Sequence, residues 1–171
     1  MNIYPDAYFR KVEDINIEFL NKNKIKALLL DVDNTLVDHT KKMTESVKKW
    51  AKELKGQGVK LYILSNTNDK EKIIRISKEL GIQYHNFAMK PLKRGFKKGQ
   101  KDLNEKSENI AIVGDQIFTD VIGGKRSKMY TILVDPINKK DFWYTKWKRP
   151  IENRIKEKIK NRIKGENNVL Q

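Results

Sequence analysis

Residues 25–35 read IKALLLDVDNT, an apolar run that ends in two aspartates, an asparagine and a threonine. The run is short and shows no polar alternation, which is typical of a strand buried on both faces of a parallel sheet. Ligands of open parallel sheets bind outside the carboxyl ends of the strands. This stretch therefore predicts both a fold class and the place where functional residues gather.

Similar apolar runs recur along the chain, separated by stretches with helical periodicity. The further runs are residues 59–64 (VKLYIL), 110–113 (IAIV) and 130–134 (YTILV), and apolar residues recur at helical spacing in residues 43–54 and 70–80. A repeated strand–helix–strand pattern predicts a parallel sheet with helices on both faces. The expected fold is therefore α/β, a doubly wound Rossmann-like sheet.

Polar residues follow several of the predicted strands. Asp31, Asp33 and Thr35 follow the first, Ser65 and Asn66 the second, and Asp115 and Asp120 a later one. Two carboxylates as close as Asp31 and Asp33 are costly unless a cation lies between them. Oxygen ligands without histidine or cysteine suit Mg²⁺. The simpler alternatives are an Asx-rich turn that caps a helix and, for Asp120, a charge that supports a helix N-terminus.

The composition is strongly basic. The chain has 171 residues, 37 Lys and Arg against 22 Asp and Glu, a net charge of +15 and no cysteine. The missing cysteines exclude disulfides, thiolate zinc sites and a cysteine nucleophile. The charge is compatible with three kinds of partner: nucleic acid, an anionic membrane surface or phosphorylated small molecules. It is equally compatible with a bias of the source genome toward proteins rich in Lys, Asn and Ile.

Composition divides the chain into three predicted regions: an N-terminal lead-in segment at 1–24, a core at 25–135 and a basic extension at 136–171. The extension holds four clustered aromatic residues and, after Pro150, isoleucines at four-residue intervals, a pattern that predicts a basic amphipathic helix. Between residues 139 and 166, 11 Lys and Arg oppose 4 Asp and Glu. Such a helix could contact anionic lipid or pack on the core.

The N-terminal residues lack the long apolar segment of a secretory signal, and no window is apolar enough to cross a bilayer. We therefore expect a cytoplasmic protein, with peripheral contact at the inner face of the membrane as a refinement of that expectation.

Four motifs together resemble those of haloacid dehalogenase superfamily phosphatases. LLLDVDNTL resembles the D-x-D-x-T loop, ILSNT the second motif, AMKPLKRG the segment with the third-motif lysine, and VGDQIFTD the final acidic motif. Either Lys90 or Lys93 fits the lysine position. More narrowly, Pro5 and Tyr8, the KPLKRGF segment and the basic extension resemble subfamily IIIA proteins of the YqeG type, which are similar to the yeast mitochondrial phosphatidylglycerophosphatase.

The resemblance implies a role for each motif residue. Asp31 would be the nucleophile that becomes an aspartyl phosphate, and Asp33 the general acid and base. Mg²⁺ would be held by Asp31, Asp115 and the backbone carbonyl of Asp33, with Asp120 in support. Thr35, Ser65, Asn66 and Lys93 would bind the phosphoryl group, and Lys90 would neutralise its charge.

The spacing of the motifs also predicts an open site. Only 29 residues separate Thr35 from Ser65, and 23 separate Thr67 from Pro91, so neither gap holds a cap domain beyond a helix and a strand. An open site suits a large substrate. The expected activity is hydrolysis of a phosphomonoester, with a phospholipid head group, phosphatidylglycerophosphate, as first choice; the alternatives are a nucleotide or nucleic-acid-end phosphatase, or an RNA- or ribosome-associated binding protein.

Overall fold

The computed structural model describes residues 3–138, 154, 157, 158 and 161. The chain divides into two units, Met1–Ile137 and Asn138–Gln171. In the second unit five residues are described: Asn138 is half-buried outside any helix, and the residues at 154, 157, 158 and 161 are helical and exposed. The aromatic cluster and the isoleucines of the predicted amphipathic helix lie outside the described residues. The first unit carries the sheet and the candidate site.

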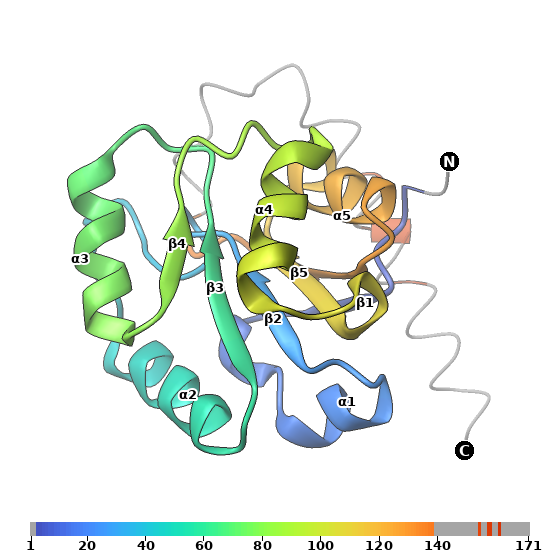
Figure 1. Cartoon of the computed structure of the whole chain (residues 1–171), viewed down its shortest axis with the longest axis horizontal. Coiled ribbons are helices and arrows are strands. Elements are labelled where there is room, and N and C mark those ends of the chain that lie inside the picture. The colour runs from blue at the N-terminus through green and yellow to red at the C-terminus, as the bar shows by residue number, and fades with distance from the viewer. Residues whose placement is uncertain (1–2, 139–153, 155–156, 159–160, 162–171) are drawn as a thin grey trace. The chain divides into compact units, whose positions relative to one another are not determined.

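A six-stranded sheet forms the centre of this unit, and all of its strand pairs are parallel (Figure 1). The strands are β1 (Ala7–Phe9), β2 (Ala27–Leu30), β3 (Lys60–Leu64), β4 (Gln83–His85), β5 (Ile110–Gly114) and β6 (Tyr130–Val134). Their order across the sheet is β1-β6-β5-β2-β3-β4. The four strands predicted from apolar runs are the four central ones, and the α/β Rossmann-like fold is confirmed.

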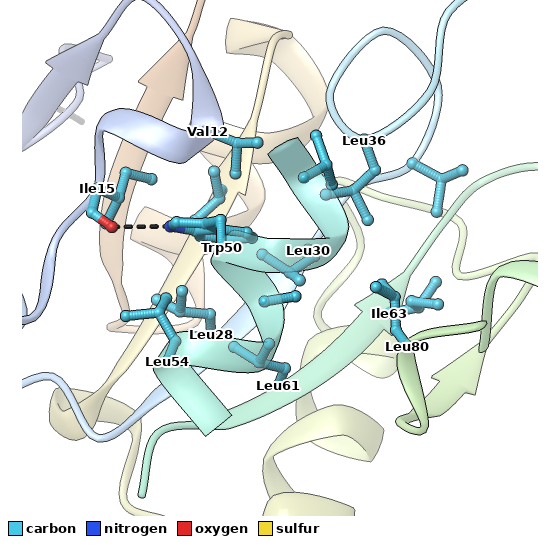
Figure 2. Close-up of a cluster of buried hydrophobic side chains, with 14 of the residues drawn as sticks. Val12, Ile15, Leu28, Leu30, Leu36, Trp50, Leu54, Leu61, Ile63 and Leu80 are labelled. Atoms are coloured by element: carbon cyan, nitrogen blue, oxygen red, sulfur yellow. Dashed lines mark hydrogen bonds between the residues drawn. The ribbon is translucent and has the colours of Figure 1, made fainter. Parts of the chain in front are cut away.

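One face of the sheet is covered by the first three helices, α1 (Ile17–Lys22), α2 (Glu45–Gly56) and α3 (Lys70–Leu80), with the short turn η1 (Val12–Asp14). Trp50 of α2 lies in the middle of this layer among buried aliphatic side chains (Figure 2). Its indole Nε1 donates a hydrogen bond of 2.8 Å to the Ile15 carbonyl oxygen. The N-terminal 24 residues thus supply an edge strand and part of this core.

The other face is covered by α4 (Lys93–Leu103) and α5 (Ile122–Arg126), with α4 in front of the sheet in Figure 1. Short turns precede β5 and α5, namely η2 (Ser107–Asn109) and η3 (Ile117–Val121). Glycines let α4 approach closely: a Cβ on Gly99 would lie 2.8 Å from Leu29, and one on Gly95 would lie 2.6 Å from the Ala88 carbonyl oxygen. This close packing fixes α4 against β2 and against the loop between β4 and α4.

Residues 31–92, all of which the structure describes, hold no separate cap domain between the motifs. The segment between β2 and β3 contains only a loop and α2, and the segment between β3 and β4 contains only α3. These two segments therefore add no separate domain over the carboxyl edge of the sheet. Within the described part of the chain, no helix has the length and apolarity that a membrane span requires.

Candidate active site

The sequence predicts a site at the carboxyl ends of β2, β3 and β5, and the polar residues of the motifs lie there. Asp31 directly follows β2, and its backbone N–H continues the sheet pairing by donating to the Val113 carbonyl oxygen at 2.9 Å. Beyond it the chain turns sharply: Asn34 has a φ of 61°, and its N–H donates to the Val37 carbonyl oxygen at 2.8 Å. Asparagine tolerates this left-handed backbone better than most residues. The turn brings Thr35 back under the loop.

Three buried carboxylates gather at this edge. One oxygen each of Asp31, Asp115 and Asp120 lies within 4.8 Å of the others, and all three side chains are buried. Gly114 makes room for the third, because a Cβ there would overlap the Asp120 carboxylate. The Gln116 backbone N–H donates to Asp120 Oδ2 at 3.1 Å. The structure thus adds Asp120 to the cluster as a full member.

Lys90, in the loop between β4 and α4, offsets part of this negative charge. Its Nζ lies 2.6 Å from Asp31 Oδ1 and 2.7 Å from Asp120 Oδ1, and its side chain is 1% exposed. Asn66 holds the Lys90 backbone with two hydrogen bonds, one from Nδ2 to the Lys90 carbonyl oxygen and one from the Lys90 N–H to Oδ1. The side-chain amide of Asn66 therefore links the loop after β3 to the loop that carries Lys90.

Electrostatics of the cluster favour a bound cation. Burial raises the pKa of the Asp31 carboxyl to about 7; Lys90 opposes this change and the Asp120 charge reinforces it. Burial by itself lowers the pKa of Lys90, but the charges of Asp120 and Asp31 outweigh it and hold that pKa above its ordinary value. Three buried carboxyl groups and one ammonium group gather in this cluster. Oxygen ligands of this kind fit a hard divalent cation.

Asp33 has a different partner from Asp31. Lys72 on α3 places its Nζ 2.6 Å from Asp33 Oδ1; the Lys72 side chain is 7% exposed, and that of Asp33 is 48% exposed. Sequence reasoning missed Lys72, because a lysine beside the apolar stripe of an amphipathic helix looks like an ordinary solvated residue. The carboxylate of Asp33 thus faces both solvent and a buried lysine.

The hydroxyl groups of the motifs are also buried at this edge. The Ser65 Oγ accepts a hydrogen bond of 3.2 Å from the Thr67 backbone N–H. The Thr35 Oγ1 has no hydrogen-bond partner among the described residues, and it borders a cavity of about 350 Å³ that Arg10 and Lys11 also line. Lys93, in contrast, is exposed in the first turn of α4. Of the two candidate lysines, Lys90 contacts Asp31.

Comparison with known proteins agrees with the geometry. Residues 1–138 match the family model described as "Mitochondrial PGP phosphatase". The chain is 33% identical over 159 residues to the "Probable phosphatase YqeG" of Bacillus subtilis (strain 168), and the match covers 92% of each chain.

Solved structures share the fold at low sequence identity. The cobalt-bound deoxy-D-mannose-octulosonate 8-phosphate phosphatase of Haemophilus influenzae superposes with a TM-score of 0.54 at 19% identity, over 66% of this chain and 69% of that one. A haloacid dehalogenase-like hydrolase of Brucella suis 1330 gives 0.50 at 8% identity, over 67% and 90%.

The fold, the ordered acidic motifs and these matches define a phosphatase of the haloacid dehalogenase type. Within that class, the chain belongs to the family described as mitochondrial PGP phosphatase.

Proposed function

We propose that the protein is a Mg²⁺-dependent phosphomonoesterase that works through an aspartyl phosphate on Asp31 and dephosphorylates phosphatidylglycerophosphate. The observation that carries the proposal is the buried cluster in which Lys90 bridges Asp31 and Asp120, with Asp115 beside them. A buried carboxylate at the end of a central strand, held by a lysine, has a fixed position at the carboxyl edge of the sheet. That position suits a nucleophile toward phosphorus.

In the first step, an Asp31 carboxylate oxygen attacks phosphorus and the ester P–O bond to the alcohol breaks. The leaving oxygen takes a proton from Asp33, whose carboxyl group is half exposed and so within reach of a substrate at the edge. Lys90 offsets the negative charge of the attacking group and of the phosphoryl oxygens. Ser65 and Thr35 supply hydroxyl donors beside this position, and the exposed Lys93 offers a further positive charge for the phosphate.

In the second step, water attacks the phosphorus of the aspartyl phosphate. Asp33, now ionised, accepts a proton from that water, and the bond between Asp31 and phosphorus breaks to release inorganic phosphate. The proton count of Asp33 is thereby restored for the next cycle. Lys72 keeps the Asp33 carboxylate at the mouth of the site between the two steps.

A divalent cation would be held by Asp31 and Asp115, by the Asp33 backbone carbonyl as the motif implies, and with Asp120 close by. The ion supplies charge stabilisation for the transferring phosphoryl group when it is bound. The donors fit Mg²⁺ because all of them are oxygens and because three of them are carboxyl groups within 4.8 Å of one another.

The lipid substrate is supported by two observations. The family whose model matches this chain is described by that activity in mitochondria, and residues 31–92 contain no cap domain. An edge without a cap domain admits a head group that stays attached to a lipid bilayer, whereas enclosed sites suit small free metabolites.

A phosphate-release panel tests the proposal. The full chain is assayed with Mg²⁺ on phosphatidylglycerophosphate in detergent micelles, on nucleotides, on DNA with terminal phosphates and on sugar phosphates. We expect the lipid to be hydrolysed fastest, and chelation to abolish turnover. Preference for a nucleotide or a DNA end would overturn the lipid assignment, and full activity in chelator would overturn the metal requirement.

A further inference from the structure

The loop next to Lys90 exposes large apolar side chains. Among the described residues, four large hydrophobic side chains are exposed, and three of them lie in the six-residue stretch around the site lysine: Phe87 at 59%, Met89 at 39% and Leu92 at 49%. The loop runs from the end of β4 to the start of α4, near the top of the coloured ribbon in Figure 1. Contiguous exposed apolar groups of this kind mark interaction sites more often than chance surface residues.

This loop is also held in an unfavourable backbone conformation. Phe87 and Met89 have φ angles of 52° and 51°, in the left-handed region that bulky residues rarely adopt. The loop is nevertheless fixed, because the Phe87 N–H donates to the Thr67 carbonyl oxygen at 3.1 Å and the Ala88 N–H to the Ser65 carbonyl oxygen at 2.9 Å. Strained residues of this kind cluster in functional segments.

The first turns of α4 add positive charge to the same place. Leu92 is the N-cap and makes no side-chain capping hydrogen bond, and the first turn contains no acidic residue. Lys93, Arg94 and Lys97 are exposed, and no carboxylate of the described residues lies within ion-pair distance of them. Cations at the positive end of a helix destabilise it, so folding of α4 does not explain their placement.

We propose that these residues form a docking surface for an anionic phospholipid bilayer, in which Phe87, Met89 and Leu92 enter the head-group region while Lys93, Arg94 and Lys97 contact lipid phosphates. The proposal deepens the proposed function and rests on its lipid substrate. Docking on this loop brings Lys90, and with it Asp31, to the membrane surface. A lipid phosphate then reaches the cluster without leaving the bilayer.

The side-chain types favour a lipid surface over other anionic partners. Two of the three apolar side chains, Met89 and Leu92, are not aromatic: they gain free energy in the acyl boundary but do not stack on bases, which leaves Phe87 as the single stacking group of the surface. The combination of a small apolar tip and flanking cations is the pattern of proteins that bind anionic membranes at the interface.

A fluorescent label at the loop tests the docking directly. Because the chain has no cysteine, Met89→Cys in the full chain gives a single labelling site for an environment-sensitive dye. Vesicles of phosphatidylcholine with about one third phosphatidylglycerol provide the surface. We expect a blue-shifted emission and quenching by nitroxide lipids at position 89. A matched label at Lys52→Cys, on an exposed position of α2, should report water throughout.

Substitutions separate docking from folding. The triple variant Phe87→Asn, Met89→Asn, Leu92→Ser replaces the apolar groups by residues that better tolerate a left-handed backbone or an N-cap position. We expect vesicle affinity to fall about tenfold or more, with turnover of a water-soluble phosphomonoester retained. Arg94→Gln with Lys97→Gln should weaken binding about fivefold per charge, while Lys49→Gln with Lys52→Gln on α2 should weaken it less.

The outcomes distinguish this inference from the proposed function. Two results would overturn the docking proposal and leave the lipid phosphatase assignment standing. In the first, the chain binds vesicles but the label at position 89 is as exposed to water as the one at position 52. In the second, the chain hydrolyses the lipid in micelles but does not bind vesicles. Shielding of the label by RNA and not by vesicles would also overturn it. Conversely, a shielded label in a chain that does not hydrolyse the lipid supports docking and removes the proposed substrate.

Discussion

Lys90 joins two regions that depart from ordinary protein surfaces in opposite ways. On one side, Asp31 and Asp120 are carboxylates buried around its ammonium group. On the other side, Phe87 and Met89 of the same loop expose apolar side chains to solvent. The first region buries charged groups in the protein, and the second exposes apolar side chains to solvent. Only a few residues of the same loop separate them.

Neither region is explained by its contribution to the stability of the fold alone. Buried ion pairs rarely stabilise a fold more than apolar packing would, because desolvation cancels much of the attraction. Exposed apolar groups on a left-handed backbone contribute no burial. The buried charges fit phosphate chemistry, and the exposed apolar loop fits delivery of the substrate to that chemistry.

The largest effect is expected from removing the proposed nucleophile. Asp31→Asn should lower turnover by roughly 10⁴-fold or more, since the amide cannot form the aspartyl phosphate. Asp38→Asn, a carboxylate farther along the same loop, is the matched control and should keep wild-type turnover. Steady-state phosphate release measures both. Substantial activity of the Asp31 variant would remove the buried cluster from the chemistry.

The next effect separates the two candidate lysines. Lys90→Gln leaves the buried carboxylates of Asp31 and Asp120 without their shared counter-charge, and in chelator it should lower the free energy of unfolding by about 3–5 kcal/mol. Lys93→Gln, at an exposed position, should change that free energy by less than about 0.5 kcal/mol. Urea denaturation measures both variants. Equal stabilities would contradict the bridging role of Lys90.

A smaller effect is expected at the glycine beside the cluster. A methyl group at Gly114 would overlap the Asp120 carboxylate, so Gly114→Ala should cost about 1–3 kcal/mol and weaken the binding of divalent cations. The control is Gly56→Ala at the end of α2, where a Cβ would meet no atom within 4 Å. Thermal unfolding with and without Mg²⁺ measures both. A fully stable Gly114→Ala with normal cation binding would show that Asp120 need not lie where it does.

The smallest effect concerns the lysine that contacts Asp33. Lys72→Gln removes a charge-assisted hydrogen bond and should lower kcat about tenfold with little change in KM, because the general acid loses its fixed position. Lys72→Arg should restore part of the rate, and Lys70→Gln on the exposed side of α3 should have no effect. A change confined to KM would instead make Lys72 a substrate ligand.

The sequence predicts the centre of the fold better than its edges. The four central strands are apolar runs because both of their faces are buried, and such runs are visible without a structure. The edge strands β1 and β4 have three residues each and are only partly buried, so they leave no such signal. The helix α4 is hidden for another reason: its packing face contains Gly95 and Gly99, so no full apolar stripe appears.

The site follows the same division. Asp31 and Asp115 can be predicted because each directly follows a recognisable strand, and the motif spacing points to Asp33 and Lys90. The partners of these residues depend on tertiary packing. Lys72 reaches Asp33 across 39 positions of sequence, and Asp120 joins Asp31 only because Gly114 leaves space. The exposure of Phe87 and Met89 is likewise invisible in a list of apolar residues.

The most direct test of the central claim is trapping the covalent intermediate. The full chain is mixed with a ³²P-labelled phosphomonoester, the one that it hydrolyses fastest in the panel, and is quenched in acid within the first turnover. We expect ³²P label bound to the protein, which hydroxylamine releases and which is absent in Asp31→Asn. Turnover without any protein-bound label, or label that persists in Asp31→Asn, would contradict it.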